Sequence, residues 1–528
     1  MLIDGKSLEK GSRLESDVCI LGCGVAGTVI ANELKGKFNN ICVIESGNEN
    51  FDPEVQALYE PSSQHKTFFN PHYSRLRMLG GSSNHWENNT SPFDAIDFEK
   101  RDWVKDSGWP IQYADISPYY KKAAEYCGAG SQGYAPQTWE KNLGEQSITH
   151  DSQTIDTGIS IFSSPPVRFF ASYGDALIND TALKVYKNCN VVDLAFDEAS
   201  EEVNGVLFET QPGNRFYISA KLVILCFGGI ENARMLLHFN KSKNNRLGNT
   251  HDNVGRYFMD HPVVEAAHFF PNDQSIYKFY QDSHADGKNI VAYLKLNDQA
   301  IRKHGLNNLR LPLIPKDNFY LSDGVSSFHI LKNAASEGEA PDHFGTHVVN
   351  FIKDIDMIAE GISRQKFKTK LFDDAEEIEG FMVYMMMEQT PHRDNRIKLS
   401  ANKDRFGIPK IEIDWTLTDS DKENLWKALE VLAQDVGERS LGRLKILKER
   451  EQRMWREGIG FGHHHMGTTK MAANEKEGVV DKNQKVFGTK NLYVAGSSVF
   501  PTGGHVPPTL TITATSIRLA QHIEKEHI

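Results

Sequence analysis

The sequence predicts an α/β fold with a Rossmann-like nucleotide-binding domain, and two apolar strands with glycines between them carry this prediction. Residues 18–21 form an unbroken apolar run, typical of a parallel strand covered on both faces, and the run ends at Gly22. A helix with apolar residues at helical spacing follows and stops at Gly36, and a second apolar strand, residues 41–44, ends at Glu45. These segments form one complete βαβ unit.

Length and composition narrow the class of protein. With 528 residues, of which 39% are hydrophobic, the chain exceeds what one core usually serves, so two or more domains are expected. The net charge of -11 comes from interspersed acidic and basic residues, which disfavours nucleic-acid binding. The sequence shows no apolar run of about 18 residues and no charged leader with an apolar core, so we expect a cytoplasmic protein without a membrane span. The six cysteines are expected to be reduced and mostly buried.

A second domain is expected downstream of the βαβ unit. Residues 191–196 and 206–208 resemble antiparallel strands, and residues 222–226 form a buried strand that rejoins the first sheet. From about residue 262 to 458 the pattern changes to irregular strands and turns. This segment also has a polar insert near residues 333–345 and a helical pattern over residues 421–436.

The Gly22-x-Gly24-x-x-Gly27 loop has the residues that a bound dinucleotide needs. Gly22 permits the tight turn, Gly24 lets the backbone approach a pyrophosphate, and Gly27 lets helix and strand pack closely. The helix that follows directs its positive dipole end at the phosphates, and Glu45 is placed to accept ribose hydroxyls. The alternative is a glycine-rich turn without a ligand, which the complete βαβ context disfavours. The loop does not separate FAD from NAD, although Glu45 disfavours a phosphorylated ribose.

Further motifs follow in order along the chain. They are Gly80-Gly81-Ser82-Ser83-Asn84-His85-Trp86, Ser107-Gly108-Trp109-Pro110, Gly228-Gly229-Ile230-Glu231-Asn232-Ala233-Arg234, and a tail with His463-His464-His465-Met466-Gly467-Thr468-Thr469, Asn491-Leu492-Tyr493-Val494-Ala495-Gly496-Ser497-Ser498 and Pro507-Pro508-Thr509-Leu510-Thr511. With the dinucleotide loop they resemble the glucose-methanol-choline (GMC) oxidoreductases, and the match is closest to the bacterial branch that contains pyranose oxidase and the fructose dehydrogenase large subunit. The resemblance covers nearly the whole chain and is weakest from about residue 262 to 380.

The resemblance implies a fold that is α+β overall. It combines a Rossmann-like FAD-binding domain with a discontinuous substrate-binding domain built on an antiparallel sheet. The FAD-binding domain would comprise residues 1–100, 165–261 and 459–528. The substrate-binding domain would comprise residues 101–164 and 262–458.

FAD is the cofactor that the resemblance implies. Its ADP part would lie on the dinucleotide loop, its adenine against residues 191–192, and its flavin ring between residues 80–86 and the tail. His85 matches the histidine that pyranose oxidase joins covalently to the flavin, so we hypothesise the same bond; the alternative is a histidine that only packs on or hydrogen-bonds the flavin. The residues expected to contact FAD are Gly22, Gly24, Val25, Ala26, Gly27, Glu45, Gly81, Ser82, Ser83, Asn84, His85, Val192, Gly228, Gly496, Ser497, Pro508 and Thr509.

The histidine triplet offers candidates for a catalytic base. Alcohol oxidation needs a base for the hydroxyl proton, and imidazole suits this because it titrates near neutral pH. The family's His-x-Met-Gly-Thr pattern falls on His464, and in an extended segment His464 would point opposite to His463 and His465. One alternative is a metal site on His463 and His465, for which the neighbouring sequence supplies no further ligands. The other is a triplet with only a structural role.

The end of the chain is expected to support the flavin. Residues 492–495 predict a short strand, and the resemblance implies that the turn at Gly496 and Ser497 brings backbone amides to the flavin diphosphate. A helix then begins with Pro508 in its first turn, where a missing N–H costs little. The N-terminus of this helix would stabilise negative charge on reduced flavin, and Thr509 would add a hydrogen bond.

Pro507 departs from the family pattern. Relatives commonly have asparagine or histidine at this position, where it helps to hold the substrate oxygen beside the base. Proline has neither a side-chain donor nor a backbone N–H. His505 precedes it by two residues, and in an extended segment it would face the same side, so we predict that His505 replaces the missing group.

The leading hypothesis is an FAD-dependent oxidoreductase that oxidises a CH–OH group of a sugar, glycoside or polyol, with His464 as base. Electrons would pass to oxygen, a quinone or a partner protein. The sequence is compatible with a homo-oligomer and also with a small subunit, together with which the protein would be exported. Pro507 leaves open a non-sugar substrate or a lyase-like reaction. A non-catalytic flavoprotein subunit is a third hypothesis, which the retained His464 disfavours.

Overall fold

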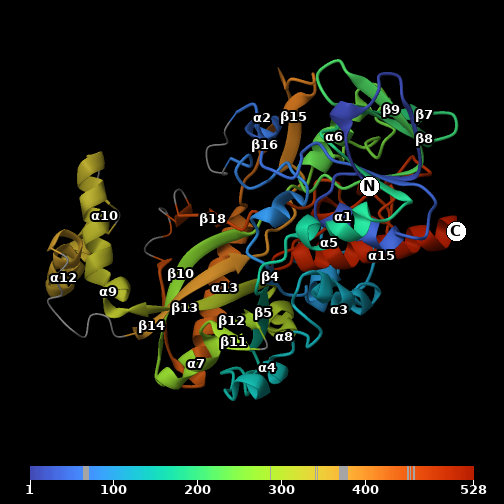
Figure 1. Cartoon of the computed structure of the whole chain (residues 1–528). Coiled ribbons are helices and arrows are strands. Elements are labelled where there is room, and N and C mark those ends of the chain that lie inside the picture. Colours follow the sequence, from blue (N-terminus) through green and yellow to red (C-terminus); the bar gives the residue numbers. More distant parts are fainter. Residues whose placement is uncertain are drawn as a thin grey trace.

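The structure is a computed structural model, and it describes the chain except residues 64–69, 286, 339, 342, 368–377, 449–450, 452–453 and 456–457. The described residues form one eight-stranded sheet, one nine-stranded sheet and a separate strand pair, with helices around them (Figure 1). The strand pair is β15 (Arg396–Lys403) with β16 (Pro409–Asp414). None of the described helices is long and apolar enough to cross a membrane.

The eight-stranded sheet contains the predicted βαβ unit. Its parallel core places β2 between β3 and β9, and β19 from the tail pairs with β9, so both ends of the chain contribute to one sheet. The order is β1 (Leu2–Asp4), β6 (Leu183–Lys187), β3 (Ile41–Ile44), β2 (Arg13–Leu21), β9 (Arg215–Leu225), β8 (Glu202–Glu209) and β7 (Asn190–Asp197), with β19 (Leu492–Val494) beside β9.

The helices on this sheet bring the tail against the dinucleotide loop. Helix α1 (Val25–Leu34) packs against both α5 (Phe169–Ile178) and the C-terminal helix α15 (Thr509–His527) (Figure 1). The buried residues of α1 include Ala26, Ile30 and Leu34, which recur every four residues and pack into one core cluster. The predicted βαβ unit is therefore confirmed.

The nine-stranded sheet is antiparallel and mostly comes from the middle of the chain. Its order is β17 (Gly442–Ile446), β10 (Pro262–Pro271), β14 (Ile378–Met387), β13 (Leu309–Asp317), β12 (Lys288–Leu296), β5 (Ile155–Ser163) and β4 (Asn89–Thr90), with β11 (Ser283–Ala285) on β12 and β18 (Gly460–Phe461) on β10. The predicted antiparallel sheet is confirmed. Strands β4 and β18 join it from outside residues 101–164 and 262–458, and the proposed domain boundaries stay predictions.

The expectation of only irregular strands and turns before residue 421 was wrong. Helices α9 (Asn318–Leu321), α10 (Asp323–Glu337), α11 (Phe344–Lys353) and α12 (Ile355–Phe367) follow β13, and α10 and α12 stand away from the rest of the molecule (Figure 1). The predicted polar insert at residues 333–345 includes residues outside the described set, and its first part continues α10. The helix expected over residues 421–436 is present as α13 (Asp419–Glu438).

The remaining helices are short and cover the sheets from several sides. They are α2 (Pro53–Gln56), α3 (Ser117–Tyr126), α4 (Pro136–Leu143), α6 (Glu231–Asn240), α7 (Tyr277–Tyr280) and α8 (Asp298–His304). One hydrophobic core cluster contains residues of both large sheets, which joins the two halves of the molecule. All six cysteines are free and buried, as predicted.

Candidate active site

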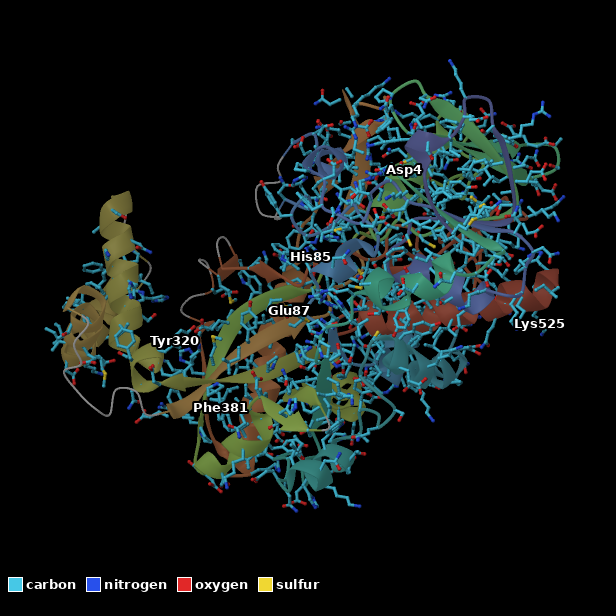
Figure 2. All side chains as sticks on the ribbon, viewed as in Figure 1. Asp4, His85, Glu87, Tyr320, Phe381 and Lys525 are labelled. Carbon is cyan, nitrogen blue, oxygen red and sulfur yellow. The ribbon has the colours of Figure 1, made fainter. Side chains whose placement is uncertain are left out.

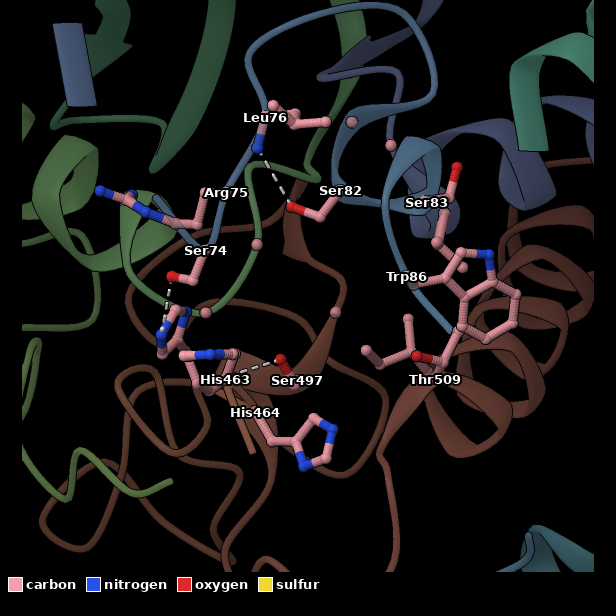
Figure 3. Close-up of a pocket in the computed structure, with 18 of the residues that line it drawn as sticks. Ser74, Arg75, Leu76, Ser82, Ser83, Trp86, His463, His464, Ser497 and Thr509 are labelled. Carbon is pink, nitrogen blue, oxygen red and sulfur yellow. Dashed lines mark hydrogen bonds between the residues drawn. The ribbon is translucent and has the colours of Figure 1, made fainter. Parts of the chain in front are cut away.

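A cavity of about 660 Å³ lies where the two large sheets meet. His85 and Glu87 lie at this junction (Figure 2), and both line the cavity. Segments far apart in sequence surround the same space, because Ser82, Ser83 and Trp86 face the tail residues His463, His464, Ser497 and Thr509 (Figure 3). The predicted site residues that line the cavity are Gly22, Gly24, Val25, Ala26, Glu45, Gly81, Ser82, Ser83, His85, Gly228, His464, Gly496, Ser497, Pro508 and Thr509.

Three glycines leave open space on one wall of the cavity. A Cβ atom built on Gly24 or Gly228 meets no atom within 4 Å, and one built on Gly496 meets only the Cα of Gly228, at 3.9 Å. Gly27 has the opposite role, because a Cβ there would lie 2.0 Å from the carbonyl oxygen of Gly22. Gly27 therefore closes the turn from behind, while the other three form a groove that a flat or extended group can enter.

Two helices begin at this groove. Gly24 is the N-cap of α1 and Pro508 is the N-cap of α15, and neither helix has a side-chain hydrogen bond at its cap. The first backbone N–H groups of a helix lack partners within the helix, and the helix dipole makes this end positive. Both helix starts therefore favour a negatively charged group in the cavity.

Glu45 lies at the end of β3 and lines the cavity. Its carboxylate accepts backbone N–H groups of Cys23 at 2.9 Å and Gly47 at 2.8 Å, so its orientation is held. Oε1 also accepts the Ser46 hydroxyl at 3.1 Å, so the further lone pair suited to a ribose hydroxyl is on Oε2.

Some predicted cofactor residues stand behind the cavity wall. Asn84 donates to the carbonyl oxygens of Leu79 and Gly81, both at 2.9 Å, and so shapes the loop. Val191, rather than Val192, lines the cavity. The pairing of β7 with β8 shifts register between residues 191 and 193, and this shift changes the face of the sheet on which each side chain lies. The sequence pattern gives no sign of the shift.

The sequence reasoning missed a cationic cluster that lines the cavity. The guanidinium of Arg75 lies 4.0 Å from the ring centre of Tyr59, and that of Arg77 lies 4.8 Å from it. Glu231 lies 3.6 Å from Arg75 and 3.4 Å from Arg77, and Arg234 adds a 2.9 Å ion pair. The signal in the sequence was the pair of arginines just before the glycine-rich loop at Gly80, because two cations beside such a loop indicate an anion site.

The histidine triplet is not a regular extended segment. His463 has a φ of 59°, in the left-handed region, and His463, His464 and His465 all line the cavity. The extended backbone on which the predicted direction of His464 depended is therefore absent at His463, although Figure 3 shows the rings of His463 and His464 on opposite sides of the segment. His465 lies with its Nε2 3.5 Å from the Ser74 hydroxyl, and its carbonyl oxygen accepts the Ser497 hydroxyl at 2.6 Å.

His464 is half-buried and lies against a second histidine. Its Nδ1 is 2.8 Å from Nδ1 of His261, and its backbone N–H donates to Oδ1 of Asp260 at 2.8 Å. Burial lowers the pKa of His464 well below its ordinary value, and the neighbouring imidazole of His261 adds to this effect. The imidazole is therefore neutral at neutral pH and can accept a proton.

His505 lies away from the cavity lining and is wholly buried. Its Nε2 is 3.7 Å from Asp94 and 3.5 Å from the Tyr293 hydroxyl, and its Nδ1 is 3.7 Å from Asp97. The prediction that His505 faces the same side as Pro507 was wrong. The segment is not extended, because Gly504 has a φ of 60° and residues 505 and 506 form a bend.

Within the described part of the chain, the one cluster with metal-ligand spacing is Asp94, Asp97 and His505. Cations and donors already satisfy its carboxylates: Lys295 lies 2.6 Å from Asp94, and the amide of Asn308 donates to Asp97 at 2.9 Å. Burial alone would raise the pKa of Asp94, but the Lys295 ammonium holds it at about 2. The histidine triplet belongs to no such cluster among these residues, so the metal alternative receives no support.

The residues present fit FAD. The open glycine groove, the two helix starts and Arg75 suit a diphosphate, and Glu45 suits a ribose. The cavity continues from this groove to His85, His464 and Thr509, where a flavin ring would be held.

Comparisons with known proteins agree with this cofactor. Residues 391–516 match the family model described as GMC oxidoreductase. The chain is 22% identical to 2-methyl-1,2-propanediol dehydrogenase of Mycolicibacterium austroafricanum, over 90% of this chain and 85% of that protein. It is 20% identical to the fructose dehydrogenase large subunit of Gluconobacter japonicus, over 97% of this chain and 98% of that protein.

Solved structures show the same fold along the whole chain. Pyridoxine 4-oxidase from Mesorbium loti superimposes with a TM-score of 0.54 at 16% identity, covering 97% of this chain and 100% of the other. A variant of formate oxidase from Aspergillus oryzae RIB40, made to study FAD modification, superimposes with a TM-score of 0.55 at 19% identity, covering 98% and 99%. Residues 391–516 therefore carry the GMC oxidoreductase C-terminal domain, and the similarity along the rest of the chain identifies the protein as an FAD-dependent oxidoreductase.

Proposed function

We propose that this enzyme oxidises a CH–OH group of a sugar, glycoside or polyol and that His464 takes the hydroxyl proton. The observation that supports this most directly is the position of His464, a half-buried neutral imidazole in the same cavity as the glycine groove. FAD, when bound, supplies the hydride acceptor. A base adjacent to that acceptor completes the chemistry of alcohol oxidation.

Helix α15 is proposed to assist the reaction electrostatically. Its first backbone N–H groups, next to Thr509, face the cavity without a side-chain cap. They lie where they stabilise negative charge that develops as the hydride is accepted. Pro508, the N-cap of α15, has no polar side chain that could bind these N–H groups, so they stay available to a ligand in the cavity.

A second candidate is an alcohol with few hydroxyl groups. Pro507 lines the cavity without a polar donor, and Val263, Met386 and Phe461 add apolar surface. An apolar wall recognises hydrocarbon better than a ring of hydroxyls, because buried hydroxyls need partners. A lyase-like reaction has no comparable observation in its favour.

Anaerobic reduction of the purified holoenzyme tests both candidates. The absorbance of oxidised flavin is followed with glucose, methyl glucoside and sorbitol, and in parallel with hexanol and benzyl alcohol. Bleaching by the polyhydroxylated group supports the first candidate, and bleaching by hexanol or benzyl alcohol alone transfers support to the second. Flavin that stays oxidised with every alcohol contradicts both. Readmission of air to a bleached sample then shows whether oxygen is the acceptor or a quinone or protein is needed.

We also propose that His85 bonds covalently to the flavin. His85 lines the cavity, and burial lowers the pKa of its imidazole, which keeps a ring nitrogen unprotonated. Acid precipitation of the holoenzyme should leave a yellow pellet, and His85→Ala should release all its flavin to the supernatant. A colourless wild-type pellet contradicts the bond and leaves His85 as a residue that packs on the flavin.

A further inference from the structure

His261 is a buried histidine next to the cavity, and its sequence context gave no signal. It directly precedes β10 and is 0% exposed. Its Nε2 lies 3.1 Å from the carbonyl oxygen of Gly503 and 3.0 Å from that of Gly504. Carbonyl oxygens only accept hydrogen bonds, so Nε2 of His261 must carry a proton and donate it to them.

The other nitrogen of His261 meets the proposed base. Nδ1 of His261 lies 2.8 Å from Nδ1 of His464, within hydrogen-bond distance. A neutral imidazole with its proton on Nε2 has only a lone pair on Nδ1, so His261 accepts and His464 donates. The Nδ1 of His464 is thereby protonated, and its Nε2 has a free lone pair.

We propose that His261 is a positioning residue that holds His464 in the Nδ1–H tautomer, with the Nε2 lone pair directed at the substrate hydroxyl. This role rests on the proposed function, in which His464 is the base. The partner of the base then comes from the segment before β10 and not from position 505 or 507 of the tail.

The opposite arrangement requires a charged His261. An imidazolium there would donate from both nitrogens, and His464 would then accept at Nδ1 and present an N–H to the cavity. Burial opposes this charge, because it lowers the pKa of His261 to about 4. The hydrogen bonds to the carbonyl oxygens of Gly503 and Gly504 raise the pKa of His261 but do not offset the effect of burial.

The backbone around the two histidines is held as one unit. Oδ1 of Asp260 accepts the N–H of His261 at 2.7 Å and that of His464 at 2.8 Å. Met259 and Met466 exchange backbone hydrogen bonds of 3.1 and 2.9 Å. The main chain therefore holds the two residues side by side, and the contacts of Nε2 with the carbonyl oxygens of Gly503 and Gly504 orient the ring of His261.

Proton transfer is balanced within this pair. The O–H bond of the substrate breaks as the Nε2–H bond of His464 forms, and the C–H electron pair leaves as hydride to FAD. His464 becomes an imidazolium whose Nδ1–H still donates to His261. The Nε2–H of His261 still donates to the two carbonyls, so their dipoles stabilise the positive charge without a second proton transfer.

Two variants of equal size separate the hydrogen bond from packing. His261→Asn places an amide oxygen near the position of Nδ1 and keeps an acceptor for His464, whereas His261→Leu has the same shape without one. The primary measurement is histidine ¹⁵N NMR of the holoenzyme at neutral pH, with His464 assigned by the signal missing in His464→Gln. We expect the Nδ1–H tautomer in the wild type and His261→Asn, and loss of its predominance in His261→Leu.

The rate of flavin reduction is the second measurement. His261→Leu should be slower by about 100-fold, and His261→Asn should stay within about 10-fold of the wild type, since general-base catalysis contributes about 10²–10⁴-fold. The proposal is overturned if wild-type His464 carries its proton on Nε2, a result that does not depend on whether either variant folds. It is also overturned if His261→Asn and His261→Leu show the same His464 tautomer and the same rate of flavin reduction. A correct tautomer in an enzyme whose His464→Gln variant reduces flavin normally upholds the hydrogen-bond assignment and contradicts the proposed function instead.

Discussion

His464→Gln is expected to slow anaerobic flavin reduction by about 10²–10⁴-fold while FAD stays bound. The substitution keeps a polar side chain of similar reach but removes the group that takes the proton. The half-buried His464 imidazole lines the cavity and is held neutral by its lowered pKa, so it can take a proton, whereas a glutamine amide cannot. Stopped-flow absorbance with a substrate found in the alcohol panel measures the rate constant.

The matched control is His150→Gln, the same substitution at a histidine whose side chain is 72% exposed. It should reduce flavin at the wild-type rate. Should His464→Gln also reduce flavin within about fivefold of wild type, with a normal flavin spectrum, the base assignment would be wrong.

Gly24→Ala is expected to weaken FAD binding by about 10–100-fold without unfolding the protein. Gly24 has φ -80° and ψ -161°, which alanine adopts readily, and a Cβ there meets no protein atom within 4 Å. The added methyl group therefore enters only the space proposed for the diphosphate. Overpacking of this kind costs about 1–3 kcal/mol, and 1.4 kcal/mol corresponds to a tenfold change in affinity.

Fluorescence titration of apoprotein with FAD measures this affinity, in wild-type and His85→Ala backgrounds so that a covalent bond does not mask the effect. Gly437→Ala is the control, because its Cβ also meets no atom within 4 Å but lies on α13, away from the cavity. Equal FAD affinity in Gly24→Ala and Gly437→Ala would contradict the proposed position of the diphosphate in the glycine groove.

The local part of the site could be predicted from the sequence because it depends on short spacings. Gly22, Gly24 and Gly27 lie within one turn, and Glu45 ends the next strand, so their arrangement follows from a single βαβ unit. Reading side-chain direction along the tail failed for His505, since alternation holds only for an extended backbone. His463 adopts a left-handed conformation, and the chain bends around His505.

By itself, the sequence determined the βαβ unit and its dinucleotide groove, because both depend on residues close together in the chain, and the resemblance of its motifs implied FAD and His464 as the base to test. The tertiary structure alone decided what lies next to that base. His261 and His464 are 203 positions apart, and the pairing of Met259 with Met466 brings them together. Tail bends bury His505 against Asp94 and Asp97 instead. The tautomer of a base depends on hydrogen bonds from other segments, and these exist only after the two sheets and the tail have packed.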